Sequence, residues 1–231
     1  MFNYSMLLNL SGISCLVVGA GTVGCRKALR LLEAGAGKVR MVAPSTPGTS
    51  EIPLRKFQTF ERIERKFAEK DIDQAVLVFA ATNDYALNHE IAAICKSKGL
   101  LCNSASCPDD GNFTVPASLK SGELNFAVGA GQAGPALSKL ICRDFASLAE
   151  KKYKKAVDLM LFARPLILAL DLDFETRRNL LTGLAELSLD FSEKRFLVLK
   201  QRMEASLPPE LNEEIVARIA GAKRNSLGNA G

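Results

Sequence analysis

Gly19-Ala20-Gly21-Thr22-Val23-Gly24 is a glycine-rich hexapeptide that lies between two segments of opposite character. Before it, Ser14–Val18 is a short apolar run rich in β-branched residues, which predicts a buried strand. After it, Cys25–Ala34 has the apolar spacing of a helix. A strand, a GxGxxG loop and a helix in this order indicate the first βα turn of a Rossmann-type domain.

Each glycine of the loop has a physical role in this interpretation. Gly19 allows the tight turn, Gly21 lets a pyrophosphate approach the backbone, and Gly24 lets the helix pack closely against the strand. The phosphates then lie on free N–H groups at the start of the helix, near Thr22 and Val23. A merely structural glycine turn is the alternative, but the flanking strand and helix favour a nicotinamide dinucleotide.

Two further segments are expected to contact the cofactor. The second expected strand, Lys38–Val42, continues into Ala43, Pro44 and Ser45, where an acidic residue normally holds the ribose. Backbone groups, Pro44 and Ser45 must contact the ribose instead. Because no carboxylate is present to reject a 2′-phosphate, this position does not decide between NAD and NADP. Ala81-Thr82-Asn83 ends another expected strand near the nicotinamide half. A cap of the following helix by Asn83 or Asp84 is compatible with this role.

The rest of the first half alternates strands with helices, which predicts a parallel, doubly wound α/β sheet. The expected elements after the loop of residues 43–53 are an edge strand at Arg62–Phe67, a buried strand at Ala75–Ala80, a helix at Asn83–Lys98 and a strand at Leu100–Asn103.

The pattern changes after the turn sequence Cys107-Pro108-Asp109-Asp110-Gly111. Thr114–Leu119 and Leu124–Val128 are expected to form short strands, and from Pro135 onward apolar residues recur at helical spacing. The sequence therefore predicts a small strand-containing region and then a helical part.

Composition excludes several classes of protein. The 231 residues are 48% hydrophobic with a formal charge of +5, spread too evenly to indicate nucleic acid but suited to an anionic small ligand. The six cysteines have neither a CxxC pair nor zinc spacing, so we expect no metal site and a reducing cytoplasm. Met1–Leu10 lacks the features of a secretory signal, and no run approaches the roughly 20 apolar residues of a membrane span.

Several motifs together carry a family resemblance. The chain resembles the precorrin-2 dehydrogenase family, the N-terminal module of siroheme synthase, some members of which are also sirohydrochlorin ferrochelatases. The match runs from about Leu7 to Phe145. The matching motifs are Val17–Ala28, Val42-Ala43-Pro44, Ala80–Asp84 with Asn88, Asn103, Phe113 with Pro116-Ala117, and Gly134–Leu137 with Arg143.

The resemblance implies NAD-dependent removal of two hydrogens from precorrin-2, which gives sirohydrochlorin on the route to siroheme. It also implies a homodimer with the tetrapyrrole bound between domains. The division we expect is an NAD-binding domain at residues 1–113, a dimerisation region at 114–147, a helical domain at 148–222 and a frayed tail at 223–231.

Two positions depart from the family pattern. The family has an Asp three residues after the Asn that matches Asn103, and here that position is Ser106. A serine is not a base at neutral pH, so the proton must pass to water, to another group, or to Asp109 and Asp110, which are also ordinary turn residues. The hydroxyl-rich stretch before Pro135 is also lost. We expect dehydrogenation to survive and ferrochelatase activity to be doubtful.

Basic residues suit a substrate with many carboxylates. Lys139 and Arg143 are four residues apart on an expected helix and project from one face, so they join Asn103 as expected substrate contacts. The single histidine, His89, is expected to face solvent or cap a helix.

Two alternative functions remain open. One is a binding module for a dinucleotide or tetrapyrrole whose catalysis is reduced, which the serine at position 106 favours. The other is an unrelated short Rossmann dehydrogenase, which is disfavoured because Tyr153 has no lysine four residues later.

Overall fold

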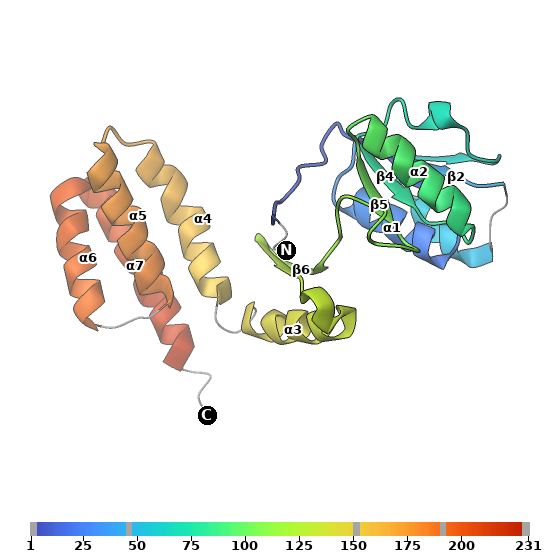
Figure 1. Cartoon of the computed structure of the whole chain (residues 1–231). Helices are drawn as coiled ribbons and strands as arrows, with labels where there is room; N and C mark the ends of the chain where they lie inside the picture. The colour runs from blue at the N-terminus through green and yellow to red at the C-terminus, as the bar shows by residue number, and fades with distance from the viewer. Residues whose placement is uncertain (1–3, 45–47, 150–152, 190–192, 228–231) are drawn as a thin grey trace. The chain divides into compact units, whose positions relative to one another are not determined.

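The computed structural model describes residues 4–44, 48–149, 153–189 and 193–227. The chain forms two compact units, Met1–Val115 and Pro116–Gly231, and each is described by itself. The first unit is an α/β domain (Figure 1).

The first unit is built on a five-stranded parallel sheet. The strand order is β3-β2-β1-β4-β5, which confirms the expected doubly wound architecture. The strands are β1 Ser14–Val18, β2 Lys38–Val42, β3 Phe60–Ile63, β4 Leu77–Ala80 and β5 Leu101–Ser104.

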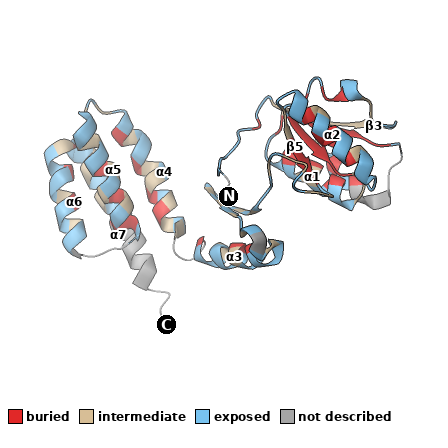
Figure 2. Ribbon diagram, viewed as in Figure 1, coloured by how far each residue is buried: buried red, intermediate tan, exposed pale blue. Residues whose placement is uncertain are grey.

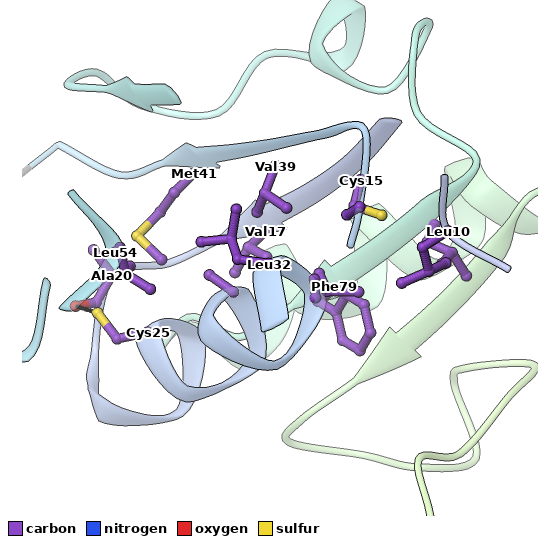
Figure 3. Close-up of a cluster of buried hydrophobic side chains, with 14 of the residues drawn as sticks. Leu10, Cys15, Val17, Ala20, Cys25, Leu32, Val39, Met41, Leu54 and Phe79 are labelled. Atoms are coloured by element: carbon purple, nitrogen blue, oxygen red, sulfur yellow. Dashed lines mark hydrogen bonds between the residues drawn. The ribbon is translucent and has the colours of Figure 1, made fainter. Parts of the chain in front are cut away.

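Helices α1 (Thr22–Glu33) and α2 (Tyr85–Ser97) supply apolar side chains to two separate hydrophobic clusters. Because side chains alternate along a strand, Val17 packs with Leu32 of α1 while Leu16 packs with Ile91 of α2. Figure 3 shows the first cluster, in which Val39 and Met41 lie beside Val17. Two 3-10 helices, η1 Gly48–Leu54 and η2 Glu69–Asp71, complete the unit.

The register of the sheet brings four loops to one edge. Val18 pairs with Val42 on one side and with Ala80 on the other, and Ala80 pairs with Ser104. The segments that follow these strands therefore leave the sheet at the same level. This is the edge at which ligands bind in open α/β sheets.

The second unit begins with an antiparallel pair, β6 Ala117–Ser121 and β7 Leu124–Val128, against which helix α3 (Pro135–Leu148) packs. A short 3-10 helix, η3 Gly131–Ala133, precedes α3. Four more helices share a buried cluster that includes Leu159, Leu184 and Met203. Figure 2 shows how burial varies along these helices. They are α4 Lys154–Leu168, α5 Phe174–Leu189, α6 Glu193–Ser206 and α7 Pro209–Leu227.

Some expected boundaries were wrong. The strand expected at residues 114–119 begins at Ala117, because Pro116 lacks the N–H that a ladder needs. The edge strand expected at 62–67 is β3, Phe60–Ile63. The loop expected at 43–53 contains η1, and the first helix starts at Thr22 rather than Cys25. Among the described residues, no helix is both long and apolar enough to cross a membrane.

Candidate active site

The glycine loop after β1 is held by backbone contacts. Gly19 has a φ of +107°, which favours glycine, and its N–H donates to the carbonyl of Val42 at 2.9 Å. A Cβ at Gly19 would collide with the carbonyl of Ala81, so this loop and the segment after β4 are in direct contact. A Cβ at Gly24 would collide with the carbonyl oxygen of Gly19. Two of the three glycines are therefore required by packing.

Gly21 differs, because a Cβ added there would meet no atom within 4 Å. It is the N-cap of α1, no side chain caps the helix, and the first turn carries no acidic residue. The N–H groups at Thr22 and Val23 therefore face no competing carboxylate from that turn. Open space beside a positive helix end fits the pyrophosphate of a dinucleotide.

The end of β2 is held by Arg62, a residue that no sequence motif singled out. Its Nη1 donates to the carbonyls of Ala43 at 3.0 Å and Ile63 at 2.8 Å. Its Nε lies 3.2 Å from the carboxylate of Glu51, which is 2% exposed. Pro44 is exposed beyond this bridge, and Ser45 lies outside the described residues. The carboxylate of Glu51 thus pairs with Arg62, and also with Arg55 at 4.0 Å.

The segment after β4 presents the second expected cofactor contact. Ala81 is buried and donates its N–H to the carbonyl of Val18 at 2.8 Å, while Asn83 is exposed. The N-cap of α2 is Asp84, whose carboxylate accepts from the N–H of Leu87 at 3.1 Å. Of the two residues expected to cap α2, Asp84 does so and Asn83 does not.

Asn88 joins the segment after β4 to the segment after β5. It is fully buried at 0% exposure, and its amide oxygen accepts from the N–H of Thr82 at 3.1 Å and from the hydroxyl of Thr82 at 2.8 Å. Its amide nitrogen donates to the carbonyl of Thr82 at 3.0 Å and to the hydroxyl of Ser106 at 3.0 Å. Ser106 is half-buried. The structure therefore links two of the expected site residues, Thr82 and Ser106, through a single side chain.

Asp109 and Asp110 lie in the turn after Ser106. Asp110 pairs with His89, whose Nδ1 lies 3.1 Å from its carboxylate oxygen. The His89 side chain is 70% exposed, as expected, but it also anchors this turn to α2. Asp109 and Asp110 line a small cavity with Lys96 and Cys102.

Asn103 has a structural contact of its own. It is 7% exposed, and its amide nitrogen donates to the carbonyl of Phe113 at 3.0 Å. The Phe113 ring stands edge-on to Phe79, with 5.5 Å between centroids. The ammonium of Lys27 lies 5.3 Å from the centroid of the Phe79 ring.

Lys27 is a second residue whose position the sequence did not suggest. Burial lowers the pKa of its ammonium, and the positive charges of Arg26 and Arg30 on the same helix lower it further. The thiol of Cys25 behaves differently: burial raises its pKa, and its Sγ donates to the carbonyl of Ala20 at 3.3 Å. Cys25 is therefore packed as a neutral thiol and is unsuited to nucleophilic chemistry.

Lys139 and Arg143 lie on α3 of the second unit, and both are exposed. Buried Ser138, beside Lys139, accepts from the N–H of Ala130 at 3.1 Å through its hydroxyl, which ties α3 to the end of the hairpin. The same unit has a large cavity whose accessible lining is apolar, bordered by Leu124, Phe126 and residues of α4 and α5. Side chains that can donate hydrogen bonds, Tyr153, Arg164 and Ser188, also border this cavity.

Comparisons with known proteins agree with this geometry. The family described as Putative NAD(P)-binding matches residues 6–117. A precorrin-2 dehydrogenase of Priestia megaterium is 32% identical over 200 residues, which cover 86% of this chain and 95% of that protein. The solved structure of SirC, a precorrin-2 dehydrogenase, has 27% identity and a TM-score of 0.67, and the match covers 95% of this chain and 100% of that one.

Longer proteins match over a part of their length. A siroheme synthase of Nitrosococcus oceani is 33% identical over 148 residues, which cover 64% of this chain and 31% of that protein. The chain therefore corresponds to about a third of this relative.

The fold and the glycine loop define an NAD(P)-binding module of the Rossmann type. More particularly, the chain belongs to the precorrin-2 dehydrogenase family. The family resemblance, the α/β fold, and the expectation of an NAD-using oxidoreductase are thereby confirmed.

Proposed function

We propose that this protein oxidises precorrin-2 to sirohydrochlorin with NAD as the hydride acceptor, a step in siroheme formation. The observation that carries the proposal is the open space beside Gly21, at the sheet edge where Thr82 and Ser106 also lie. A dinucleotide on Gly21 would direct its nicotinamide half along this edge towards those two residues. Likeness to a precorrin-2 dehydrogenase over nearly its whole length supports the choice of substrate.

The residues that would hold NAD come from three loops. The N–H groups of Gly21, Thr22, Val23 and Gly24 would bind the pyrophosphate, with Gly19 shaping the turn. Pro44 would lie along the adenosine ribose, and Ala81, Thr82 and Asn83 along the nicotinamide. When bound, NAD supplies the hydride acceptor, and the protein supplies placement of the substrate carbon against it.

The proton that leaves with the hydride needs a separate acceptor. Ser106 would contact the substrate through its hydroxyl, and Asp109 or Asp110 would take the proton directly or through water. Asn103, Lys139 and Arg143 are the proposed substrate contacts. Because Ser106 replaces the family carboxylate, we propose that ferrochelatase activity is weak.

We further propose a homodimer formed through β6, β7 and α3, within the dimerisation region expected at residues 114–147. A two-stranded sheet is marginal by itself, and Leu119, Leu124 and Phe126 remain half-buried although α3 packs on the pair. On α3, Leu137 and Leu140 are 44% and 53% exposed. A second copy would cover these apolar side chains.

The state of the cysteines is consistent with a reducing compartment. All six are free thiols, and five of them are buried. We propose the cytoplasm as the place where the protein acts.

The proposed reaction is tested by an anaerobic assay of precorrin-2 with NAD. Formation of NADH and sirohydrochlorin in equal amounts is expected, and a folded protein that gives neither product refutes the proposal. The same assay on Asp109→Ala and Asp110→Ala identifies the proton acceptor, because the variant that lacks it should lose activity by about a hundredfold. Ser106→Asp restores the family carboxylate and should raise metal insertion into sirohydrochlorin, which absorbance reports.

A second candidate function is favoured by the serine at position 106. Without a carboxylate there, the protein could bind a dinucleotide and a tetrapyrrole without turnover. Tight binding of both ligands with no NADH formed would identify this function, whereas turnover would exclude it.

A further inference from the structure

The side chain of Asn88 is buried and hydrogen-bonded at the sheet edge. Asn88 is the fourth residue of α2 and is 0% exposed, so an unpaired amide there would be costly. Its carboxamide makes four hydrogen bonds, three to Thr82 and one to Ser106. Since Asp84 already caps α2 through Leu87, the start of the helix does not depend on Asn88.

These contacts determine the orientation of the amide. The N–H of Thr82 can only donate and its carbonyl can only accept, so the oxygen of Asn88 must face the former and the nitrogen the latter. The nitrogen also lies 3.0 Å from the hydroxyl oxygen of Ser106, which must therefore accept.

The direction of this bond leaves the hydroxyl hydrogen of Ser106 available to donate. The nearest hydroxyl, that of Ser104, is 3.4 Å away, which is longer than the roughly 2.7–2.8 Å of a good O–H···O bond. One of the two acceptor sites of the Ser104 hydroxyl is already occupied, because it accepts from the N–H of Cys107 at 3.3 Å. Ser106 is thus arranged to give a hydrogen bond to a ligand.

We infer that Asn88 is a positioning residue, which holds Ser106 as a hydrogen-bond donor to the substrate and holds Thr82 in place along the cofactor. The inference rests on the proposed function for Ser106, while the part that concerns Thr82 needs only dinucleotide binding. One buried amide therefore aligns the two ligands of the reaction with each other.

A double-mutant cycle tests whether Asn88 acts through Ser106. We expect Asn88→Ala to lower kcat by about tenfold when Ser106 is present, but by less than about twofold in a Ser106→Ala protein. Asn88→Asp has nearly the volume of Asn88 and retains the acceptor for Thr82, so it serves if the alanine variant fails to fold; circular dichroism decides this. It should show the same dependence on Ser106.

Asn112 provides a matched control. Its amide also makes two backbone hydrogen bonds, from Cys102 N–H at 2.8 Å and to the carbonyl of Leu100 at 2.8 Å, with no contact to Ser106 among the described residues. Any loss in kcat from Asn112→Ala should be the same with and without Ser106.

Cofactor titration separates this inference from the proposed function. Asn88→Ala should weaken NADH binding by about threefold to tenfold whether or not Ser106 is present, and this is measurable without precorrin-2. Equal losses of kcat in both backgrounds, or unchanged NADH affinity, would overturn the positioning role. If the wild-type protein shows no turnover but Asn88→Ala still weakens NADH binding, precorrin-2 oxidation is refuted. The inference that Asn88 positions Thr82 for the cofactor would then still hold.

Discussion

The carbonyl oxygen of Gly19 occupies the space that a Cβ at Gly24 would need. The carbonyl of Gly19 is backbone, so it cannot move aside as a flexible side chain would. Gly24→Ala should therefore destabilise the first unit by about 1–3 kcal/mol, the usual cost of overpacking. Thermal unfolding followed by circular dichroism measures this, and an unchanged melting temperature would contradict the close packing of loop and helix.

For Gly21 we expect the opposite result, a substitution that affects cofactor binding and not stability. A methyl group there meets open space, so Gly21→Ala should leave the melting temperature nearly unchanged and weaken NADH binding by at least about tenfold, because the methyl group occupies the phosphate position. Isothermal titration with NADH checks the affinity. Unaltered binding would show that the pyrophosphate lies elsewhere.

Asp71 makes the first unit sensitive to acid. Its carboxylate is 4% exposed and accepts from Arg65 and from the N–H of Ala68, and the bond from Arg65 is the main reason that its pKa lies below the usual 3.8. A lowered carboxyl pKa adds stability above the unfolded-state value, and this stability is lost as the pH falls through the folded-state value. We expect the unfolding free energy to decline in acid from about pH 4 downward.

Asp71→Asn tests this assignment. At neutral pH the variant should be less stable by about 1–3 kcal/mol, and its stability should vary less with pH in acid. Asp73→Asn is the control, since Asp73 is 58% exposed and pairs with Lys98 at the surface. Urea titrations at several pH values make the comparison, and parallel pH curves for Asp71→Asn and the wild type would argue against it.

Leu140 tests the proposed dimer. It is 53% exposed on α3, and a charge there should prevent a second copy from covering the hairpin region. We expect Leu140→Glu to sediment as a monomer. Leu197→Glu on α6, where Leu197 is 55% exposed, should remain a dimer. A wild-type protein that is monomeric at micromolar concentration would remove the dimer from the proposal.

The order of strands and helices in the first unit followed from local patterns. The apolar run at β1, the glycine loop and the helix after it are contiguous, so short-range periodicity predicts them. Turn and strand boundaries near Pro116 were less predictable, because the ladder there depends on its partner strand.

The side-chain connections of the site could not be predicted from the sequence in the same way. The contact between Asn88 and Ser106 spans 18 residues and depends on how α2 packs against the sheet. The bridge from Arg62 to Glu51 and to the end of β2 depends on the register of β3 against β2. Only tertiary packing brings such residues together.

In the proposed complex the phosphates bind to backbone N–H groups of Gly21 and the first turn of α1, where no side chain caps the helix. Peptide groups are common to every residue type, so mutation of Thr22 or Val23 would leave these donors in place provided that the helix still begins there. Binding of this kind constrains the backbone conformation more than the identity of the side chains, so other residue types at these two positions are compatible with the same coenzyme.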